Sequence, residues 1–512
     1  MRRFFFTVTH TGHKASHIAD MLAYWPVMLF LATYAPAQLI TDTAGFTARD
    51  RQVYGPAIRY IVNDTMRGIH IVWKTGYGNI LYNFCPCDST WRWENGVIVN
   101  EYPRNLGCLG IDITTGQALI GTDYLSRGIP QATYFSNSTS GNGVFVESRI
   151  APGYRHVLAA TSRYGWPRFA ALRNDSLFFL SPWSYRFLEP VGPFPSHNLA
   201  SSKQCGRFGY IFSKTSGSGK GNLFLKETPN NGANWYTTVN LSDSVPSDFN
   251  RSLLGGCAIY DSIRLHLVVG FYDGARRNQS QIWHYAKYDS PPWHLVHQFV
   301  LPDSVNIGDC ALAAGRPSIG RNPHNGEYYI VWEQFNQHNI DHMTGLCRAD
   351  IWASRSCNNG KTWGEPVRLT QPDETSKRFP FLAEVADDTL HIIYFADQVA
   401  GFWEQNQGPR TINPVIHLRV ASDFLPAGIA QSKQTGNIYP DFRIVPTISN
   451  SSFMIYTQST IRLQVFNNSG RMVANLVATK PVFRWNPALQ PGVYFIRSTI
   501  PAFTAFRILR VR

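Results

Sequence analysis

The chain has 512 residues, of which 16% are charged and 14% are aromatic, and it contains 40 Gly and 31 Pro. This composition fits neither a disordered chain nor a helical bundle, which would carry more Ala, Glu and Lys. It favours many short strands joined by turns, in two or three domains. The formal net charge is +13, but the basic residues are scattered, which does not favour a nucleic-acid partner.

Residues 1–37 are predicted to be a signal peptide. Residues 21–37 form an apolar run that ends in Ala35-Pro36-Ala37, the small-x-small pattern of a signal-peptidase site. The segment before this run is unusually long, so Met21 is an alternative start. A membrane anchor or a buried strand is the other interpretation, although the run is short for a spanning helix and no later stretch is long enough. We therefore expect an exported chain with no transmembrane segment after cleavage.

Residues 45–426 are predicted to form a six- or seven-bladed β-propeller. A strand of alternating apolar residues recurs at intervals of roughly 40 to 65 residues, the range of propeller blades. Alternation places one face of each strand against a neighbouring sheet. The seven copies lie at 68–73, 116–120, 175–179, 221–225, 264–269, 327–332 and 389–394. A pair of all-β sandwiches is the alternative fold.

Three of these copies carry a histidine at the same position, namely His70, His266 and His391. A repeated sequence repeats its side chains, and each histidine would lie in a different blade, so a shared metal is not expected. Cys85-Pro86-Cys87 could ligate a metal, but no second close pair or His cluster completes a zinc site. No metal or cofactor is therefore predicted.

Eight cysteines in an exported chain allow disulfides. Cys347 and Cys357 are the favoured pair, because they could face each other across a hairpin. The remaining cysteines are interpreted as isolated thiols.

Two predicted hairpin turns, at residues 228–235 and 356–363, have similar sequences. A central Asn and Gly supply the positive φ that a tight turn needs. Both turns resemble the Asp-box, Ser-x-Asp-x-Gly-x-Thr-Trp, of sialidase-like propellers. The corresponding residues are Ser356, Asn358, Gly360, Thr362 and Trp363 in one turn, and Thr228, Asn230, Gly232 and Trp235 in the other. Asn replaces the Asp in both, and the resemblance implies a fold and no chemistry.

The active site of that family holds a substrate carboxylate with three arginines and carries a Tyr–Glu nucleophile pair and an acidic Asp. The first arginine usually precedes Ile-Pro early in the propeller, whereas the nearest string here, Arg316-Pro317-Ser318, comes late and lacks the middle residue. Glu333 and Asp397 are possible carboxylates of a central funnel, but residues in such positions are more often ordinary strand-end residues. The spacing singles out no three among Arg59, Arg163, Arg168 and Arg378, so no catalytic residue is nominated.

Residues 427–440 are rich in Gly, Ser and Gln and are predicted to be a linker. Residues 441–512 are predicted to form a small immunoglobulin-like β-sandwich of seven short strands. Within it, residues 463–473 and 489–497 resemble two signatures of the type IX secretion sorting domain, and the chain ends on a short basic strand like that of the family. The motif residues are Gly470, Arg471, Gly492, Val493, Tyr494 and Arg497. An unrelated immunoglobulin-like module for adhesion or spacing is the alternative.

The resemblance implies recognition by an outer-membrane secretion machinery and a secreted or cell-surface destination. For the propeller, the favoured hypothesis is a glycan- or protein-binding module. The alternatives are a sialidase-like glycoside hydrolase and a structural surface protein without a ligand. Three aromatic loops, at residues 91–93, 164–166 and 183–185, could stack on sugars or pack between blades.

Overall fold

The computed structural model describes residues 39–53, 58–87, 89–192, 195–215, 221–246, 256–272, 276–427, 442–445, 448–457, 461–467, 471–479, 482–498 and 505–510. The predicted signal peptide, the alternative start at Met21, Gly470 of the sorting motif and the linker beyond Ala427 lie outside these ranges.

The described residues are all-β. Apart from strands and turns they contain the short 3₁₀ helices η1 (Ser242–Ser244), η2 (Trp403–Gln405) and η3 (Ser422–Phe424), and they contain no α-helix. None of their helices has the length and apolar character needed to cross a bilayer.

Seven four-stranded antiparallel sheets, here called blades 1 to 7, cover residues 40–421. Blade 1 contains β2 (Ile61–Asp64), β3 (Gly68–Lys74), β4 (Ile80–Pro86) and β5 (Val97–Ile98). Blade 2 contains β6 (Cys108–Ile111), β7 (Ala118–Ser126), β8 (Ile129–Asn137) and β9 (Phe145–Pro152). Blade 3 contains β10 (Arg155–Thr161), β11 (Pro167–Arg173), β12 (Ser176–Ser181) and β13 (Ser184–Pro190). Blade 4 contains β14 (His197–Ser201), β15 (Phe208–Thr215), β16 (Gly221–Thr228) and β17 (Val239–Asn240).

Blade 5 contains β18 (Gly256–Tyr260), β19 (Leu265–Tyr272), β20 (Gln279–Ala286) and β21 (Trp293–Val300). Blade 6 contains β22 (Ala314–Arg321), β23 (Tyr328–Ile340), β24 (Cys347–Ser356) and β25 (Val367–Arg368). Blade 7 contains β26 (Ser376–Leu382), β27 (Thr389–Asp397), β28 (Asn413–Ala421) and, as its outermost strand, β1 (Ile40–Thr47).

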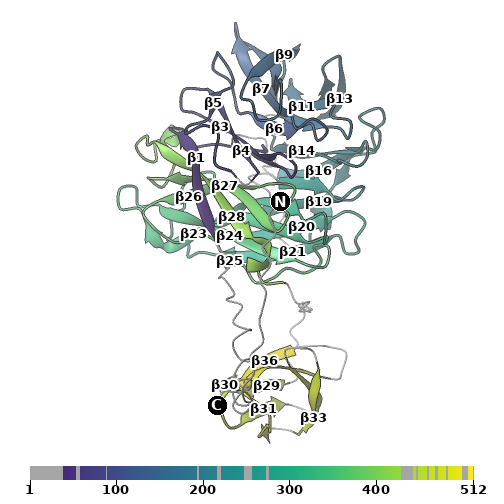
Figure 1. Cartoon of the computed structure of the whole chain (residues 1–512), viewed down its shortest axis with the longest axis vertical. Helices are drawn as coiled ribbons and strands as arrows, with labels where there is room; N and C mark the ends of the chain where they lie inside the picture. The colour runs from purple at the N-terminus through teal and green to yellow at the C-terminus, as the bar shows by residue number, and fades with distance from the viewer. Residues whose placement is uncertain are drawn as a thin grey trace, which may run out of the picture. The chain divides into compact units, whose positions relative to one another are not determined.

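The blades form a closed ring, as in a β-propeller. The first strands β2, β6, β10, β14, β18, β22 and β26 contact one another in this order, and β27 of blade 7 contacts β2 of blade 1. Figure 1 shows β1, in purple, beside the green β28 with which it pairs. Because β1 precedes blade 1 and pairs within blade 7, the two ends of the propeller segment are joined in one sheet, which closes the ring.

Antiparallel pairing defines two ends of every blade. At one end the first strand begins, and the second strand connects to the third; we call this the mouth end. At the other end the first strand connects to the second, and the third to the fourth. The turns at residues 228–235 and 356–363 both connect a third strand to a fourth, so we call this the turn end.

Large apolar side chains between the sheets form the core. Trp73 of β3 and Trp332 of β23 are completely buried, as expected for second strands that lie between two other strands of their own blade and against neighbouring blades. All seven predicted repeat copies overlap strands, and five of them are second strands. The copies at 175–179 and 221–225 are instead the third strands β12 and β16, because third strands here carry the same period-two pattern.

The predicted Cys347–Cys357 disulfide is wrong. Cys347 begins β24 and Cys357 directly follows its last residue, Ser356, so the two cysteines lie at opposite ends of one strand. Ten residues of strand span about 30 Å, whereas a disulfide needs Cα atoms roughly 6 Å apart. All eight cysteines, each of which is described, are free.

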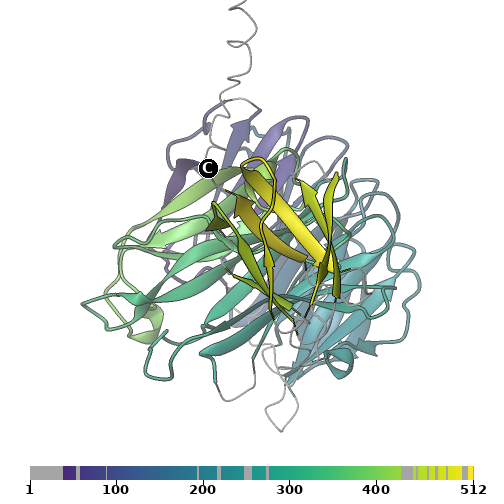
Figure 2. The ribbon, with the colours of Figure 1, turned by 90° about the horizontal axis from the view of Figure 1, so that it is seen from below.

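The C-terminal region forms two sheets of its own, drawn in yellow tones in Figure 2. One sheet contains β29 (Phe442–Val445), β31 (Phe453–Thr457) and β34 (Val482–Trp485). The other contains β30 (Ile448–Ser449), β36 (Ala505–Arg510), β35 (Gly492–Ser498), β32 (Ile461–Asn467) and β33 (Met472–Ala478). Phe453 and Trp485 of the first sheet share one core with Leu463, Val465 and Ile496 of the second. All seven predicted strands are present, with β30 in addition.

Candidate functional site

At the mouth end, two arginines enclose one glutamate. Arg316 of β22 donates from Nη1 to Oε1 of Glu333 at 2.7 Å, and Arg378 of β26 donates from Nε to Oε2 at 3.1 Å. The backbone N–H of Phe379 also donates to Oε2, at 3.0 Å, and Glu333 has no exposed surface. In the sequence these three charged residues are considered separately, and the fold brings them into contact.

Backbone bulges place the two arginines. The register of β22 shifts between Gly315 and Ser318, and the register of β26 shifts between Arg378 and Phe381. Arg316 and Phe379 have φ values of 50° and 54°, the left-handed conformation that a bulge uses to redirect a side chain. Both arginines therefore turn toward Glu333 from neighbouring blades.

This ion cluster is a structural anchor. Burial alone raises the pKa of Glu333, but Arg316 and Arg378 outweigh that effect and hold the pKa below its ordinary value. Both guanidinium groups already bind a carboxylate of the protein, so they are not free to grip the acid of a substrate.

Within the described ranges, the two tyrosine–glutamate hydrogen bonds lie at the turn end. Tyr260, the last residue of β18, donates to Glu227 near the end of β16 at 2.8 Å. Tyr329, near the start of β23, donates to Glu327 at 2.6 Å. Neither pair can act together with the arginine cluster at the mouth end. The described residues therefore do not bring together the three-arginine and Tyr–Glu arrangement of a sialidase.

The central channel is narrow. It is lined by the first strands of blades 4 to 7 and by the segment before β2, including Arg59, Cys257, Pro317 and Phe381, and its cavity measures about 50 Å³. Ligand sites typically measure about 300–1,000 Å³, so this space accommodates a few water molecules and no sugar ring. Arg59 and Glu384, which both line it, form an ion pair of 3.3 Å.

The other candidate funnel carboxylate, Asp397, ends β27 and is 4% exposed. Burial, with a smaller contribution from the nearby Asp50, raises the pKa of Asp397 to about 7. Its Oδ1 accepts hydrogen bonds from the backbone N–H of Val399 at 3.2 Å and from the Thr411 hydroxyl at 3.3 Å. Asp397 is thus a buried acid that orders the connection between β27 and β28.

The two similar turns share one hydrogen-bond pattern. In the turn at 356–363, the Ser356 hydroxyl accepts from Gly360 N–H at 2.9 Å, and the Asn358 amide oxygen accepts from Thr362 N–H at 2.9 Å. The Trp363 indole donates to the Gly360 carbonyl at 3.1 Å.

In the turn at 228–235, the Thr228 hydroxyl accepts from Gly232 N–H at 3.0 Å, and Asn230 accepts from Asn234 N–H at 2.8 Å. The Trp235 indole donates to the Gly232 carbonyl at 3.1 Å. Gly360 and Gly232 have φ values of 80° and 92°, as the sequence required. Both turns therefore fix the path between a third and a fourth strand and leave no group for chemistry.

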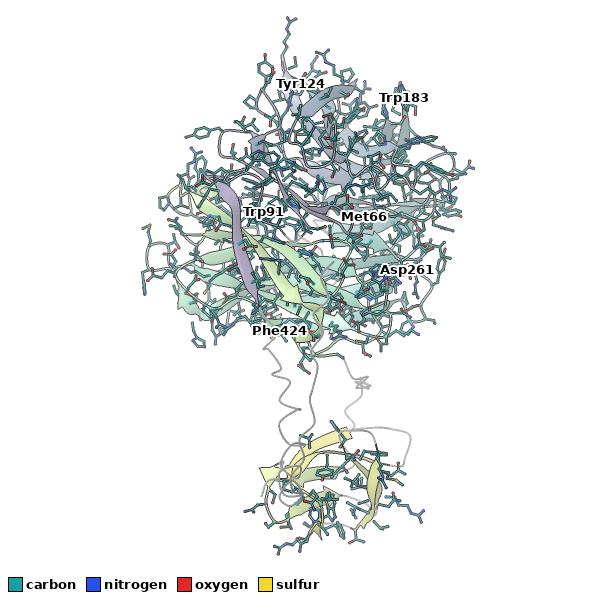
Figure 3. All side chains as sticks on the ribbon, in the orientation of Figure 1. Met66, Trp91, Tyr124, Trp183, Asp261 and Phe424 are labelled. Carbon is teal, nitrogen blue, oxygen red and sulfur yellow. The ribbon has the colours of Figure 1, made fainter. Side chains whose placement is uncertain are left out.

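The three aromatic loops have different environments. Trp91 packs edge-on against His417 of blade 7, and Trp93 packs near Tyr82 in the core. In blade 3, by contrast, Tyr164 and Trp166 are 51% and 55% exposed, and Trp183 is 84% exposed. Figure 3 shows Trp183 at the periphery of the sheets. Packing between blades therefore explains the first loop and leaves the aromatic residues of blade 3 unexplained.

Tyr164 and Trp166, together with Trp183, form what we call the blade 3 aromatic platform, at the turn end. The Tyr164 and Trp166 rings lie 5.6 Å apart between centroids and are tilted by 43°. Trp183 belongs to the two-residue turn between β12 and β13, where Ser181 pairs with Ser184, and the loop with Tyr164 and Trp166 connects β10 to β11. Both connections lie at the turn end, so the three exposed aromatic side chains lie at the same end of blade 3.

The loop that carries Tyr164 and Trp166 is firmly held. Ser162 N–H donates to the Trp166 carbonyl at 3.0 Å, and Gly165 N–H donates to the Ser162 carbonyl at 3.0 Å. Gly165 has a φ of 76°, and a Cβ there would lie 2.3 Å from Oδ1 of Asp112. The loop therefore needs glycine at this position, and its backbone lies against blade 2.

The predicted sorting motif lies in the five-stranded sheet of the C-terminal region. β32 pairs with both β33 and β35, so the segments at 463–473 and 489–497 are neighbours. Arg471 N–H donates to the Asn467 side chain at 2.9 Å, and the Tyr494 hydroxyl donates to the Gln490 carbonyl at 2.7 Å. Gly492, Val493, Tyr494 and Arg497 lie on β35, and their role in sorting stays a prediction.

Among the described residues, no group of three or more His, Cys, Asp or Glu side chains is arranged to hold a metal ion. His391 forms a hydrogen bond of 3.1 Å with His417, and His70 forms one of 2.7 Å with Tyr82. His266 contacts His284 at 3.0 Å. The three repeated histidines thus lie in blades 1, 5 and 7; His70 and His391 bond within their own blades, and His266 also bonds Tyr328 of blade 6 at 2.9 Å.

No protein-family model and no curated protein matches the chain. Its fold is similar to that of an ulvan lyase, a polysaccharide lyase, with 10% identity over 76% of this chain and 97% of the lyase, at a TM-score of 0.47. It is also similar to the Trypanosoma rangeli sialidase, with 8% identity over 91% and 85% of the two chains and a TM-score of 0.39. The six-bladed fucose-recognising lectin of Aleuria aurantia gives 9% identity over 67% and 88%, with a TM-score of 0.33. At these identities and scores, neither the activities nor the ligands of these proteins are transferred to this chain.

Proposed function

We propose that the protein is an exported, surface-directed β-propeller that binds glycans through the blade 3 aromatic platform. The observation that carries the proposal is the exposure of Tyr164, Trp166 and Trp183 at one end of one blade. Exposed large aromatic side chains cost solubility, and a cluster of them on an ordered surface marks a binding site. Flat rings cover the apolar face of a sugar, while the sugar hydroxyls keep their contacts with water and with polar neighbours.

The binding hypothesis is better supported than catalysis. The conserved chemistry of a sialidase needs free arginines, whereas Arg316 and Arg378 are both bonded to Glu333. The small channel offers no enclosed place where carboxylates could flank a glycosidic bond. If no glycan binds in the test below, protein binding and a structural role without a ligand are the remaining alternatives.

The test uses a glycan array with the purified chain and with Trp166→Ala. We expect the variant to bind its best glycan about tenfold more weakly, which corresponds to ~1.4 kcal/mol. The control is Tyr77→Ala, because Tyr77 is 78% exposed and lies at the mouth end. Absence of any glycan binding, or equal binding by Trp166→Ala and the wild type, contradicts the proposal.

Delivery to the surface is proposed to depend on the C-terminal region and an outer-membrane secretion machinery. The order of its motifs supports this, and so does the pairing of β32, in the first motif segment, with β35, in the second. Residues 441–512 fused to an exported reporter should carry it to the cell surface in a bacterium with type IX secretion. A reporter that stays in the periplasm, while the full chain reaches the surface, contradicts this assignment.

A further inference from the structure

The charge around the blade 3 aromatic platform indicates which glycans it would take. Three arginines lie at the turn end of blade 3: Arg163 and Arg168 beside the rings, and Arg186 near the start of β13. The Arg163 guanidinium lies 4.4 Å from the Tyr164 ring centroid, and that of Arg168 lies 6.0 Å from the Trp166 ring centroid. Cations and aromatic rings are thus interleaved on this surface.

Each of these arginines is bonded to uncharged groups. Arg163 donates to the Tyr164 hydroxyl, and Arg168 donates to the Pro167 carbonyl at 2.9 Å. Arg186 donates to the carbonyls of Ala233 at 2.5 Å and Gly232 at 3.3 Å. Within the described part of the chain, no carboxylate is paired with any of the three. This differs from the mouth end, where Arg316 and Arg378 are both paired with the carboxylate of Glu333.

The carboxylates near this end are already engaged. The Asp112 oxygens accept hydrogen bonds from the hydroxyls of Thr114 at 2.7 Å and Thr115 at 2.9 Å. Glu227 is bonded to Lys287 and Tyr260, and Asp261 and Asp289 are both bonded to Arg264. Glu227, Asp261 and Asp289 are thus paired with other cations, and Asp112 is the one of these four carboxylates bonded, within the described ranges, only to uncharged groups. Against the single charge of Asp112, the three arginines leave blade 3 with an excess of positive charge at this end.

The same arrangement of ring and cation continues into the next two blades. Arg186 contacts the 228–235 turn of blade 4. The next residue, Tyr236, is 48% exposed. Tyr288 of blade 5 is 65% exposed. Lys287 lies between these two tyrosines, with its Nζ 5.7 Å from the Tyr236 ring centroid and 5.0 Å from that of Tyr288. The surface thus offers stacking positions on three successive blades.

We propose that the turn end of blades 3 to 5 binds an acidic polysaccharide, whose rings stack on the aromatic side chains and whose carboxylate or sulfate groups pair with Arg163, Arg168 and Arg186. This inference rests on the proposed glycan-binding function and names its ligand class. Guanidinium groups suit such anions because they present two parallel N–H donors. Because the surface extends over three blades, it favours an oligosaccharide over a single sugar. Once one sugar of a chain is bound, its neighbours bind without a second loss of translational and rotational entropy.

The test measures the binding of the wild-type chain and of the double variant Arg163→Gln/Arg168→Gln. The ligands are one sulfated polysaccharide, one uronate-rich polysaccharide and a neutral counterpart of each. We expect the wild type to bind the acidic polymers at least tenfold more tightly than the neutral ones. The double variant should lose at least tenfold on the acidic polymers and change less than twofold on the neutral ones. Long acidic oligosaccharides should bind more tightly than disaccharides, and Tyr236→Ala/Tyr288→Ala should reduce this advantage.

The matched control is Arg410→Gln, because Arg410 also stacks on an exposed tyrosine, Tyr77, at 4.8 Å but lies at the mouth end. Equal binding of neutral and acidic polymers, or equal losses in Arg410→Gln and the double variant, overturns the inference. In the first of these outcomes the glycan-binding proposal survives. If no glycan of either kind binds, the proposed function fails as well, so the two failures are distinguishable.

Discussion

Replacing Glu333 with glutamine should severely destabilise the propeller. Its carboxylate accepts from Arg316, from Arg378 and from the backbone of Phe379, and no part of it reaches solvent. Glutamine keeps the shape but offers one acceptor oxygen, and its NH₂ group would face a donor. Two buried guanidinium groups would also lose their only carboxylate partner in the described structure.

Breaking a buried ion pair by removing one partner costs about 3–5 kcal/mol. With an m-value of about 3 kcal/mol/M in urea, the midpoint should fall by about 1 M or more. Urea unfolding followed by tryptophan fluorescence and circular dichroism measures this shift. Because the chain contains more than one folded region, the transition of the propeller is compared between variants.

Glu404→Gln is the matched control. Glu404 pairs with Arg49 at 2.5 Å, with 16% of the arginine and 23% of the glutamate side chain exposed. Ion pairs near the surface contribute about 0–1 kcal/mol, so this variant should shift the midpoint by less than about 0.3 M. A Glu333→Gln midpoint as high as that of Glu404→Gln would refute the assignment of the mouth-end cluster as a structural anchor.

Three further outcomes can be measured by urea unfolding. Gly360→Ala should lower the free energy of unfolding by more than about 2 kcal/mol, because the φ of Gly360 is 80° and a Cβ there would lie 2.1 Å from the His284 ring. Gly345→Ala is the control and should lower it by about 1 kcal/mol, because Gly345 has a φ of 69° but no atom within 4 Å of the added Cβ. Equal losses in the two variants would show that the 356–363 turn moves away from His284. Asp397 has a raised pKa, so its contribution to stability falls as the pH rises from about 4 to about 7, by roughly 2–4 kcal/mol, and Asp397→Asn should remove this fall. Glu327 behaves in the opposite way: burial raises its pKa, but Arg355 and Tyr329 outweigh this and lower the pKa to about 2. Its contribution to the stability of the fold is therefore present above about pH 4.5 and is lost as the pH drops toward 2. A pH profile unchanged in Glu327→Gln would contradict this.

The sequence alone determined the local elements. Period-two alternation identified the strands, because a strand that packs on one face needs apolar side chains at every second position. Asn and Gly at the centre of residues 228–235 and 356–363 identified the turns, since few other residues adopt positive φ there. The strands of the C-terminal region followed from the same two signals, and each predicted strand is present.

Only the tertiary structure decided what the charged and aromatic residues do. Arg316, Glu333 and Arg378 lie on three strands of two blades, and two bulges bring them together, which the spacing of the sequence does not reveal. The predicted disulfide between Cys347 and Cys357 is wrong because the single strand β24 occupies the interval for which a hairpin is predicted.

The exposed aromatic side chains show the same limit most clearly. Trp91 and Trp166 sit in similar aromatic loops in the sequence, yet one packs against His417 and the other faces solvent. Whether a ring is covered depends on the neighbouring blade, which is distant along the chain. Local chemistry therefore set the strands and turns, and packing between blades selected which side chains remain available to a ligand.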